Sequence, residues 1–183
     1  TTEIYTLSLH DALPICKPLN NEAIKGQWSM FFFGYTHCPD ICPTELLTLS
    51  YAMQEMQKQQ PDIKLPQVYF VSVDPKRDTL ELLKGYTGHF HETFVGTTGE
   101  QKELDKLTEK LNVIYEKVYH LNGRQIVLEK GDEIPEVAKD SYLINHSVNV
   151  FVTNPEGDWY STFSAPLEGE LIAKDMLTMI NAW

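Results

Sequence analysis

The fold is decided by the stretch Phe31-Phe32-Phe33-Gly34-Tyr35-Thr36-His37-Cys38-Pro39-Asp40-Ile41-Cys42-Pro43. The apolar run from Trp28 to Tyr35 has the length and composition of a strand buried on both faces of a parallel sheet. Pro43 suits the first position of a helix, and the apolar spacing from Thr44 to Lys58 predicts an amphipathic helix of about four turns. The two cysteines therefore lie between a buried strand and a helix N-terminus. The free N–H groups and the dipole at such a terminus favour the thiolate, the form that attacks disulfides and binds metals.

The remaining patterns predict one α/β domain. In chain order they predict a strand at Val68–Val73, a helix at Thr79–Tyr86, a short strand or loop at Phe94–Gly96, a helix at Glu100–Leu111, a strand at Val113–Tyr119, antiparallel strands at Val148–Val152 and Trp159–Phe163, and a helix at Leu167–Ile180. The polar segment Leu121–Asp140 is predicted to be an inserted hairpin or loop. A dithiol at the first strand-to-helix turn indicates a thioredoxin-like fold, with a central mixed sheet flanked by helices. A single domain is expected over residues 17–183, after an atypical segment of residues 1–16.

Composition excludes several classes of function. The chain has 183 residues, of which 42% are hydrophobic and 22% are charged, as in an ordinary globular domain. Its formal net charge of −11 argues against a nucleic-acid partner, because binding to phosphates needs a basic face. No stretch approaches the roughly 18 uninterrupted apolar residues of a membrane span. Three cysteines are too few for a disulfide scaffold, so we expect one redox or metal pair with Cys16 as a bystander.

Cys38 and Cys42 have three residues between them, whereas the usual dithiol oxidoreductase has two. On a helical turn this spacing puts both side chains on one face, with Cβ atoms about 5–6 Å apart. The sulfurs can then close on a metal ion, or on each other after a modest adjustment. Two soft thiolates suit Cu(I) or Zn(II), and a third ligand completes a usable site. The polar residues Thr36, His37 and Asp40 argue against a simple buried core position for the cysteines.

The chain has six histidines that could supply the third ligand. Four of them lie in peripheral or connecting segments: His10, His89, His91 and His120. His37 adjoins Cys38, and either tunes its thiolate or faces solvent. His146 immediately precedes the strand predicted at Val148–Val152, where a thioredoxin-like fold brings a loop over the dithiol. Position alone supports a ligand role and a capping or packing role for His146 equally.

Three motifs follow one another along the chain: Phe33-Gly34-Tyr35-Thr36-His37-Cys38-Pro39-Asp40-Ile41-Cys42-Pro43-Thr44, Val71-Ser72-Val73-Asp74-Pro75-Lys76-Arg77-Asp78-Thr79 and Tyr142-Leu143-Ile144-Asn145-His146-Ser147. Together they resemble the Sco (SenC) family of copper chaperones for cytochrome c oxidase. The likeness covers about Gly26 to Ile180 and includes the closing hairpin and helix.

The resemblance implies a set of site residues. Cys38, Cys42 and His146 would be the copper ligands, holding Cu(I) and, with an added ligand, Cu(II). The family also forms a disulfide between its two cysteines, so Cys38 and Cys42 would be the redox pair. Asp74 matches an acidic residue implicated in metal transfer or partner contact, although orienting the turn explains it equally well. We expect His37, like Asp74, to support the site without being a ligand.

The resemblance implies a metallochaperone more readily than an enzyme. Its recipient would be the Cu(A) site of cytochrome c oxidase subunit II, with other copper chaperones or thiol oxidoreductases as further partners. The expected location is a bacterial periplasm, with the complete protein anchored in the inner membrane. The main alternative is a thiol:disulfide oxidoreductase that reduces the oxidase or another periplasmic partner, since the helix N-terminus favours thiolate attack. A peroxiredoxin-like peroxidase ranks last, because its two cysteines would not lie four positions apart.

Three features depart from the family pattern. Asn145 stands where the family often has aspartate, and we expect the lost charge to change slightly how His146 is oriented. The segment Leu121–Asp140 is long for the simplest members, and we expect it to shape partner choice. Residues 1–15 do not resemble the family's N-terminal strand hairpin, and the match resumes at Lys17-Pro18. We expect residues 1–15 to be foreign to the gene, in place of the native N-terminus with its anchor.

Overall fold

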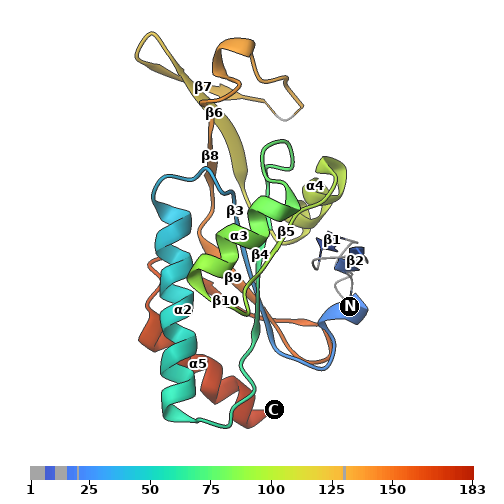
Figure 1. Cartoon of the computed structure of the whole chain (residues 1–183), viewed down its shortest axis with the longest axis vertical. Coiled ribbons are helices and arrows are strands. Elements are labelled where there is room, and N and C mark those ends of the chain that lie inside the picture. The colour runs from blue at the N-terminus through green and yellow to red at the C-terminus, as the bar shows by residue number, and fades with distance from the viewer. Residues whose placement is uncertain (1–6, 11–15, 20, 130) are drawn as a thin grey trace.

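Figure 1 shows the computed structural model of the chain, which describes residues 7–10, 16–19, 21–129 and 131–183. The helices are α1 (Asn21–Ile24), α2 (Ile41–Gln59), α3 (Leu80–Phe90), α4 (Gln101–Lys110), the 3₁₀ turn η1 (Glu136–Ala138) and α5 (Gly169–Ala182). The strands are β1 (Leu7–His10), β2 (Cys16–Leu19), β3 (Ser29–Gly34), β4 (Gln67–Ser72), β5 (Val95–Thr97), β6 (Tyr115–Leu121), β7 (Arg124–Leu128), β8 (Leu143–His146), β9 (Asn149–Thr153) and β10 (Trp159–Ser164). Most of the segment expected to be foreign, residues 1–6 and 11–15, lies outside the described residues.

Five strands form the central sheet, in the order β10-β9-β3-β4-β5. β3, β4 and β5 run parallel, whereas β9 is antiparallel to both β3 and β10. This is the mixed sheet of a thioredoxin-like fold, which confirms the predicted fold class. All six residues of β3 are buried, as its continuous apolar run predicts for a strand with both faces covered.

Helices cover both faces of this sheet. α2 and α5 pack against each other along one side of the molecule (Figure 1), and Gly34 of β3 faces Cys42 of α2. Phe31 and Phe33, which alternate with Gly34 along the strand, line a small apolar cavity together with Leu107 of α4. Because neighbouring residues of a strand point to opposite faces, α2 and α4 cover opposite faces of the sheet.

Three strands form a separate sheet, in the order β7-β6-β8. β6 and β7 make the inserted hairpin, and Figure 1 shows them projecting from one end of the molecule. β8 pairs antiparallel with β6, with Tyr115 opposite His146. The prediction of a loop before the closing hairpin was therefore wrong for Leu143–His146. These residues become a strand because β6 offers them a ladder of hydrogen-bonding partners, which no local pattern of residues 143–146 reveals.

Several predicted boundaries differ from the structure. α2 begins at Ile41 instead of Pro43, so Cys42 belongs to its first turn; Pro43 is still tolerated there because the first turn needs no N–H from it. α3 continues past the predicted end at Tyr86 to Phe90. The sequence predicts no element before residue 16, yet β1 pairs antiparallel with β2. Among the described residues, none of the helices combines the length and the hydropathy that crossing a membrane requires.

Candidate metal centre

Cys38 lies in the loop between β3 and α2 and is half-buried. Its Sγ accepts a hydrogen bond from the backbone N–H of Cys42 at 3.4 Å. That N–H belongs to the first turn of α2, where backbone donors lack partners within the helix. The side chain of Asp40, at the N-cap position, makes no capping hydrogen bond. The sulfur of Cys38 therefore takes over part of the capping role, which draws negative charge towards it.

Cys42 is fully buried in the first turn of α2. Its sulfur lies against Gly34, where an added Cβ would come within 2.7 Å of both the Cys42 Sγ and the Phe70 ring. Glycine at position 34 thus leaves the space that the sulfur occupies. The Cys42 Sγ is 3.2 Å from Nε2 of His146.

His146 reaches the cysteines from the last position of β8. Its Nδ1 lies 3.2 Å from the carbonyl oxygen of Ser147, and a carbonyl can only accept a hydrogen bond. This contact assigns the ring proton to Nδ1 and leaves the lone pair of Nε2 facing the sulfurs. The rings of Phe32 and Tyr35 pack edge-on against the imidazole, each with a centroid separation of 6.2 Å.

The two sulfurs and an imidazole nitrogen all lie within 4.8 Å of one another. In the part of the chain that the structure describes, this is the one group of three or more such side chains close enough to share a metal ion. Two soft sulfurs with one nitrogen fit Cu(I) or Zn(II), and a hard ion such as Mg²⁺ prefers oxygen. The group borders a pocket of about 280 Å³ that is lined by Cys38 and His146, so an ion can enter from that side.

The pKa values of the two thiols are shifted in opposite directions from that of an ordinary cysteine. The pKa of Cys38 lies well below its usual range, first because the Cys42 thiol donates a hydrogen bond to its sulfur, and further because backbone N–H groups nearby donate to it. The pKa of Cys42 is raised, because its proton is held in that hydrogen bond and because its side chain is buried. In the metal-free pair, Cys38 is therefore the thiol that loses its proton more readily, and Cys42 keeps its proton.

The SCO1/SenC family description matches residues 16–181. The chain belongs to the SCO1/SenC family. It is 36% identical over 152 residues to an SCO2-like protein of Rickettsia felis, covering 81% of this chain and 65% of the relative. It is 35% identical over 143 residues to mitochondrial SCO2 of Saccharomyces cerevisiae, covering 78% of this chain and 42% of that protein. The chain thus spans less than two thirds of the length of these relatives.

Solved structures of SCO1/SenC proteins share the fold. ScoI of Arabidopsis thaliana, solved with copper bound, superposes with a TM-score of 0.80 at 24% identity, covering 98% of this chain and 97% of that one. ScoI of Bradyrhizobium japonicum, also solved with copper bound, gives a TM-score of 0.71 at 27% identity, covering 97% of each chain. The central mixed sheet and its flanking helices are therefore features that this chain shares with them.

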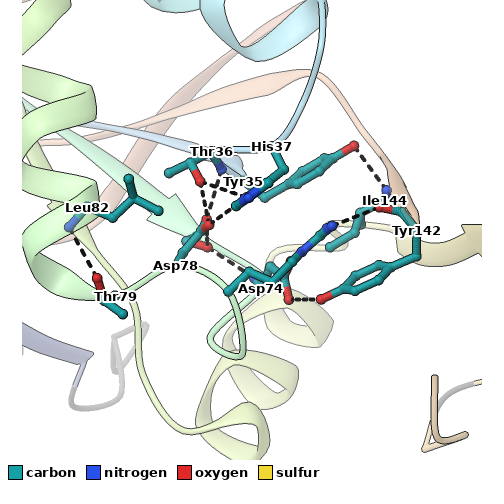
Figure 2. A network of polar contacts seen from close by, with 11 residues as sticks. Tyr35, Thr36, His37, Asp74, Asp78, Thr79, Leu82, Tyr142 and Ile144 are labelled. Carbon is teal, nitrogen blue, oxygen red and sulfur yellow. Dashed lines mark hydrogen bonds and ion pairs between the residues drawn. The ribbon is translucent and has the colours of Figure 1, made fainter. Parts of the chain in front are cut away.

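In this SCO1/SenC chain, Asp74 stands outside the group of three. It is 0% exposed and follows β4. Figure 2 shows its carboxylate accepting a hydrogen bond from the hydroxyl of Tyr142 at 2.6 Å, and its Oδ2 accepts another from Nε of Arg77 at 2.6 Å. The carboxylate is thus enclosed by its own chain, an arrangement that fits the orienting role considered for Asp74.

His37 also lies outside the group of three, on the surface beside Cys38. Its side chain is 46% exposed, and its Nδ1 is 3.6 Å from Oδ1 of Asp78. The same nitrogen lies 3.1 Å from the hydroxyl of Thr36. His37 therefore faces solvent at the edge of the site while its inner nitrogen is held by neighbouring polar groups.

Asp78 lies just before the cap residue of α3, and its carboxylate contacts the loop before Cys38. It accepts hydrogen bonds from the N–H and hydroxyl of Thr36 and from the hydroxyl of Ser72, at 2.6–2.9 Å (Figure 2). The cap of α3 is Thr79, whose hydroxyl accepts from the N–H of Leu82. Asp78 thus ties the loop before Cys38 to the end of β4. One signal was available, because polar side chains after adjacent parallel strands meet at one edge of a sheet.

Proposed function

We propose that this chain is a metallochaperone that binds copper through Cys38, Cys42 and His146. The observation that carries the proposal is the convergence of their three ligand atoms within 4.8 Å. Thiolate sulfur and neutral imidazole suit Cu(I), and an added ligand from solvent or a partner would accommodate Cu(II). The copper-bound ScoI structures of similar proteins support the choice of metal.

The recipient in this proposal is the Cu(A) site of cytochrome c oxidase subunit II. BsSco, which has the same fold, is described as a member of the Sco family of cytochrome c oxidase assembly proteins. Other copper chaperones or thiol oxidoreductases would supply copper or electrons. We place the complete protein in a bacterial periplasm, anchored to the inner membrane; a SCO1/SenC family lipoprotein of Bacillus anthracis with the same fold supports this placement.

A second candidate function is the reduction of a partner disulfide, and the unequal acidities of the two cysteines favour it. The Cys38 thiolate attacks one partner sulfur, forms a mixed disulfide and releases the other partner sulfur as a thiolate. His146, whose Nε2 is 3.2 Å from the Cys42 sulfur, is placed to accept the Cys42 proton. The Cys42 thiolate then attacks Cys38, which frees the partner as a dithiol. Two electrons pass to the partner, and Cys38 and Cys42 are left as a disulfide.

Copper titration of the reduced chain tests the first function. We expect one Cu(I) per chain, and we expect His146→Ala to weaken Cu(II) binding by at least about 10-fold, because a nitrogen ligand is lost. Competition with a chelator of known affinity measures both constants. Undiminished Cu(II) binding by His146→Ala would contradict the ligand assignment.

His89→Ala is the matched control, because His89 is exposed on α3 and stands outside the group of three. Its copper affinities should equal those of the unmodified chain. Turnover on a disulfide substrate measures the second function separately. If turnover is rapid and the copper affinity is too weak for loading, the disulfide reductase replaces the chaperone.

A further inference from the structure

The candidate metal centre is divided between two sheets. Cys38 and Cys42 follow β3 of the central sheet, whereas His146 ends β8 of the separate sheet β7-β6-β8. The 3.2 Å approach of the His146 nitrogen to the Cys42 sulfur therefore depends on how β8 is held against the central sheet. The contacts that hold β8 there are as much part of the site as the ligands.

A closed cluster of three side chains fastens the start of β8. Nε of Arg77 donates to Oδ2 of Asp74 at 2.6 Å, and the hydroxyl of Tyr142 donates to Oδ1 of the same carboxylate at 2.6 Å. Nη1 of Arg77 donates to the carbonyl oxygen of Tyr142 at 3.0 Å, and its guanidinium carbon is 3.5 Å from the centroid of the Tyr142 ring. Arg77 therefore grips both the backbone and the side chain of Tyr142, which immediately precedes β8.

The same guanidinium lies near the second attachment of β8. Its carbon is 5.7 Å from the centroid of the Tyr35 ring, and the hydroxyl of Tyr35 accepts a hydrogen bond from the N–H of Ile144 at 3.1 Å (Figure 2). The Tyr35 ring in turn packs edge-on against His146. Arg77 thus contacts Tyr142 and lies near Tyr35, the two tyrosines that attach β8 to the central sheet.

We propose that Arg77 is a positioning residue, which holds β8 so that His146 can share a metal ion with the two cysteines. The inference rests on the proposed copper function, but the geometry it describes exists without the metal. Arg77 acts through Tyr142 and Tyr35 and does not touch the ligand atoms. Lysine keeps the positive charge. It lacks the planar guanidinium, which donates to Asp74 and to the Tyr142 carbonyl while stacking on the Tyr142 ring.

The test compares Arg77→Lys with Arg124→Lys, the same substitution at an exposed position of β7. In the metal-free reduced chain, NMR cross-peaks between the rings of His146 and Tyr35 report the position of β8. We expect Arg77→Lys to lose these cross-peaks and Arg124→Lys to keep them. Retention of the cross-peaks in Arg77→Lys would overturn the proposal.

Copper provides a second readout. We expect Arg77→Lys to lower Cu(II) affinity by about 10- to 100-fold, the usual effect of removing support behind a ligand. The imidazole nitrogen coupling in pulsed EPR should fall in parallel, while alkylation of the two cysteines stays unchanged. A general loss of structure would instead alter the thiols and the imidazole together, and that result would count against a positioning role.

Tyr142→Phe keeps the test decisive if Arg77→Lys does not fold. It leaves the ring beside the guanidinium and removes only the hydrogen bond to Asp74. We expect a smaller loss of the same NMR and EPR signals, and wild-type signals in this variant would then overturn the proposal. If the unmodified chain binds no copper, the proposed function fails, yet the cross-peaks of the metal-free variants still decide whether Arg77 positions His146.

Discussion

At the scale of single residues, the division of labour between the two cysteines comes from where each sulfur lies. Cys38 is half-buried, and its sulfur accepts a hydrogen bond from the backbone N–H of Cys42 at 3.4 Å. Cys42 is fully enclosed beneath β3, where charge is poorly solvated. One proton shared between two adjacent sulfurs therefore stays on the enclosed one, and the exposed one carries the charge.

This difference predicts selective alkylation at mildly acidic pH. In a reduced, metal-free Cys16→Ser background, iodoacetamide at about pH 5.5 should modify Cys38 and leave Cys42 intact, because an ordinary thiol is protonated there. Below the pKa of Cys38 the reaction should stop. Cys42→Ala should slow modification of Cys38 at this pH, because the hydrogen bond from Cys42 is the largest cause of the lowered pKa. Peptide mass spectrometry measures both effects, and preferential labelling of Cys42 would contradict the assignment.

At the scale of elements, the pairing of β6 with β8 gives Asn145 a role that the sequence did not suggest. Asn145 lies directly opposite Glu116 on β6, and its Nδ2 donates to Oε1 of Glu116 at 3.1 Å. The next residue, His146, points to the other face of the strand, as alternation requires. An aspartate at position 145 would set two carboxylates against each other across the ladder.

Asn145→Asp should therefore destabilise the fold by about 0.5–1 kcal/mol at neutral pH, because like charges directly opposite in a sheet repel. Urea unfolding followed by circular dichroism measures the loss. The double variant Asn145→Asp/Glu116→Gln restores an amide–carboxylate pair and should recover most of the stability. An additive double variant would show that the two side chains do not interact.

At the scale of the whole molecule, the sheet, α2 and the metal centre meet at Gly34. An added Cβ there would come within 2.7 Å of both the Cys42 sulfur and the Phe70 ring. The central sheet and α2 can pack closely enough to shelter Cys42 only because this residue has no side chain. The absence of a side chain at position 34 is thus required both for the packing of α2 on the sheet and for the position of the Cys42 sulfur.

Gly34→Ala should destabilise the chain by about 1–3 kcal/mol, a typical effect of overpacking a core, and should weaken Cu(I) binding by displacing the Cys42 sulfur. Gly85→Ala is the control, because position 85 lies within α3 and an added Cβ meets nothing within 4 Å. That control should stabilise the chain by up to about 1 kcal/mol, since alanine favours a helix. Thermal unfolding and copper competition measure both variants, and equal behaviour would refute the steric argument.

Local patterns in the sequence determined most of the elements and the cysteine half of the site. The apolar run before Gly34 predicts a buried strand, and the apolar spacing after Pro43 predicts α2. Both predictions succeed because strand and helix periodicity relate residues only two to four positions apart. Cys38 and Cys42 are close in sequence, so their shared turn follows from the same local geometry. The motif around His146 suggested a third ligand only through its resemblance to a family.

Tertiary structure alone decided how the third ligand arrives. Cys42 and His146 are 104 positions apart, and no local period relates residues so distant. They meet because β8 pairs with β6 and because Arg77 and Tyr142 fasten its start to the turn after β4. Which strands pair, and which buried charges find partners, depends on the surfaces that the folded chain brings together. The contacts among Asp74, Arg77 and Tyr142 that support the metal centre could therefore be found only from the structure.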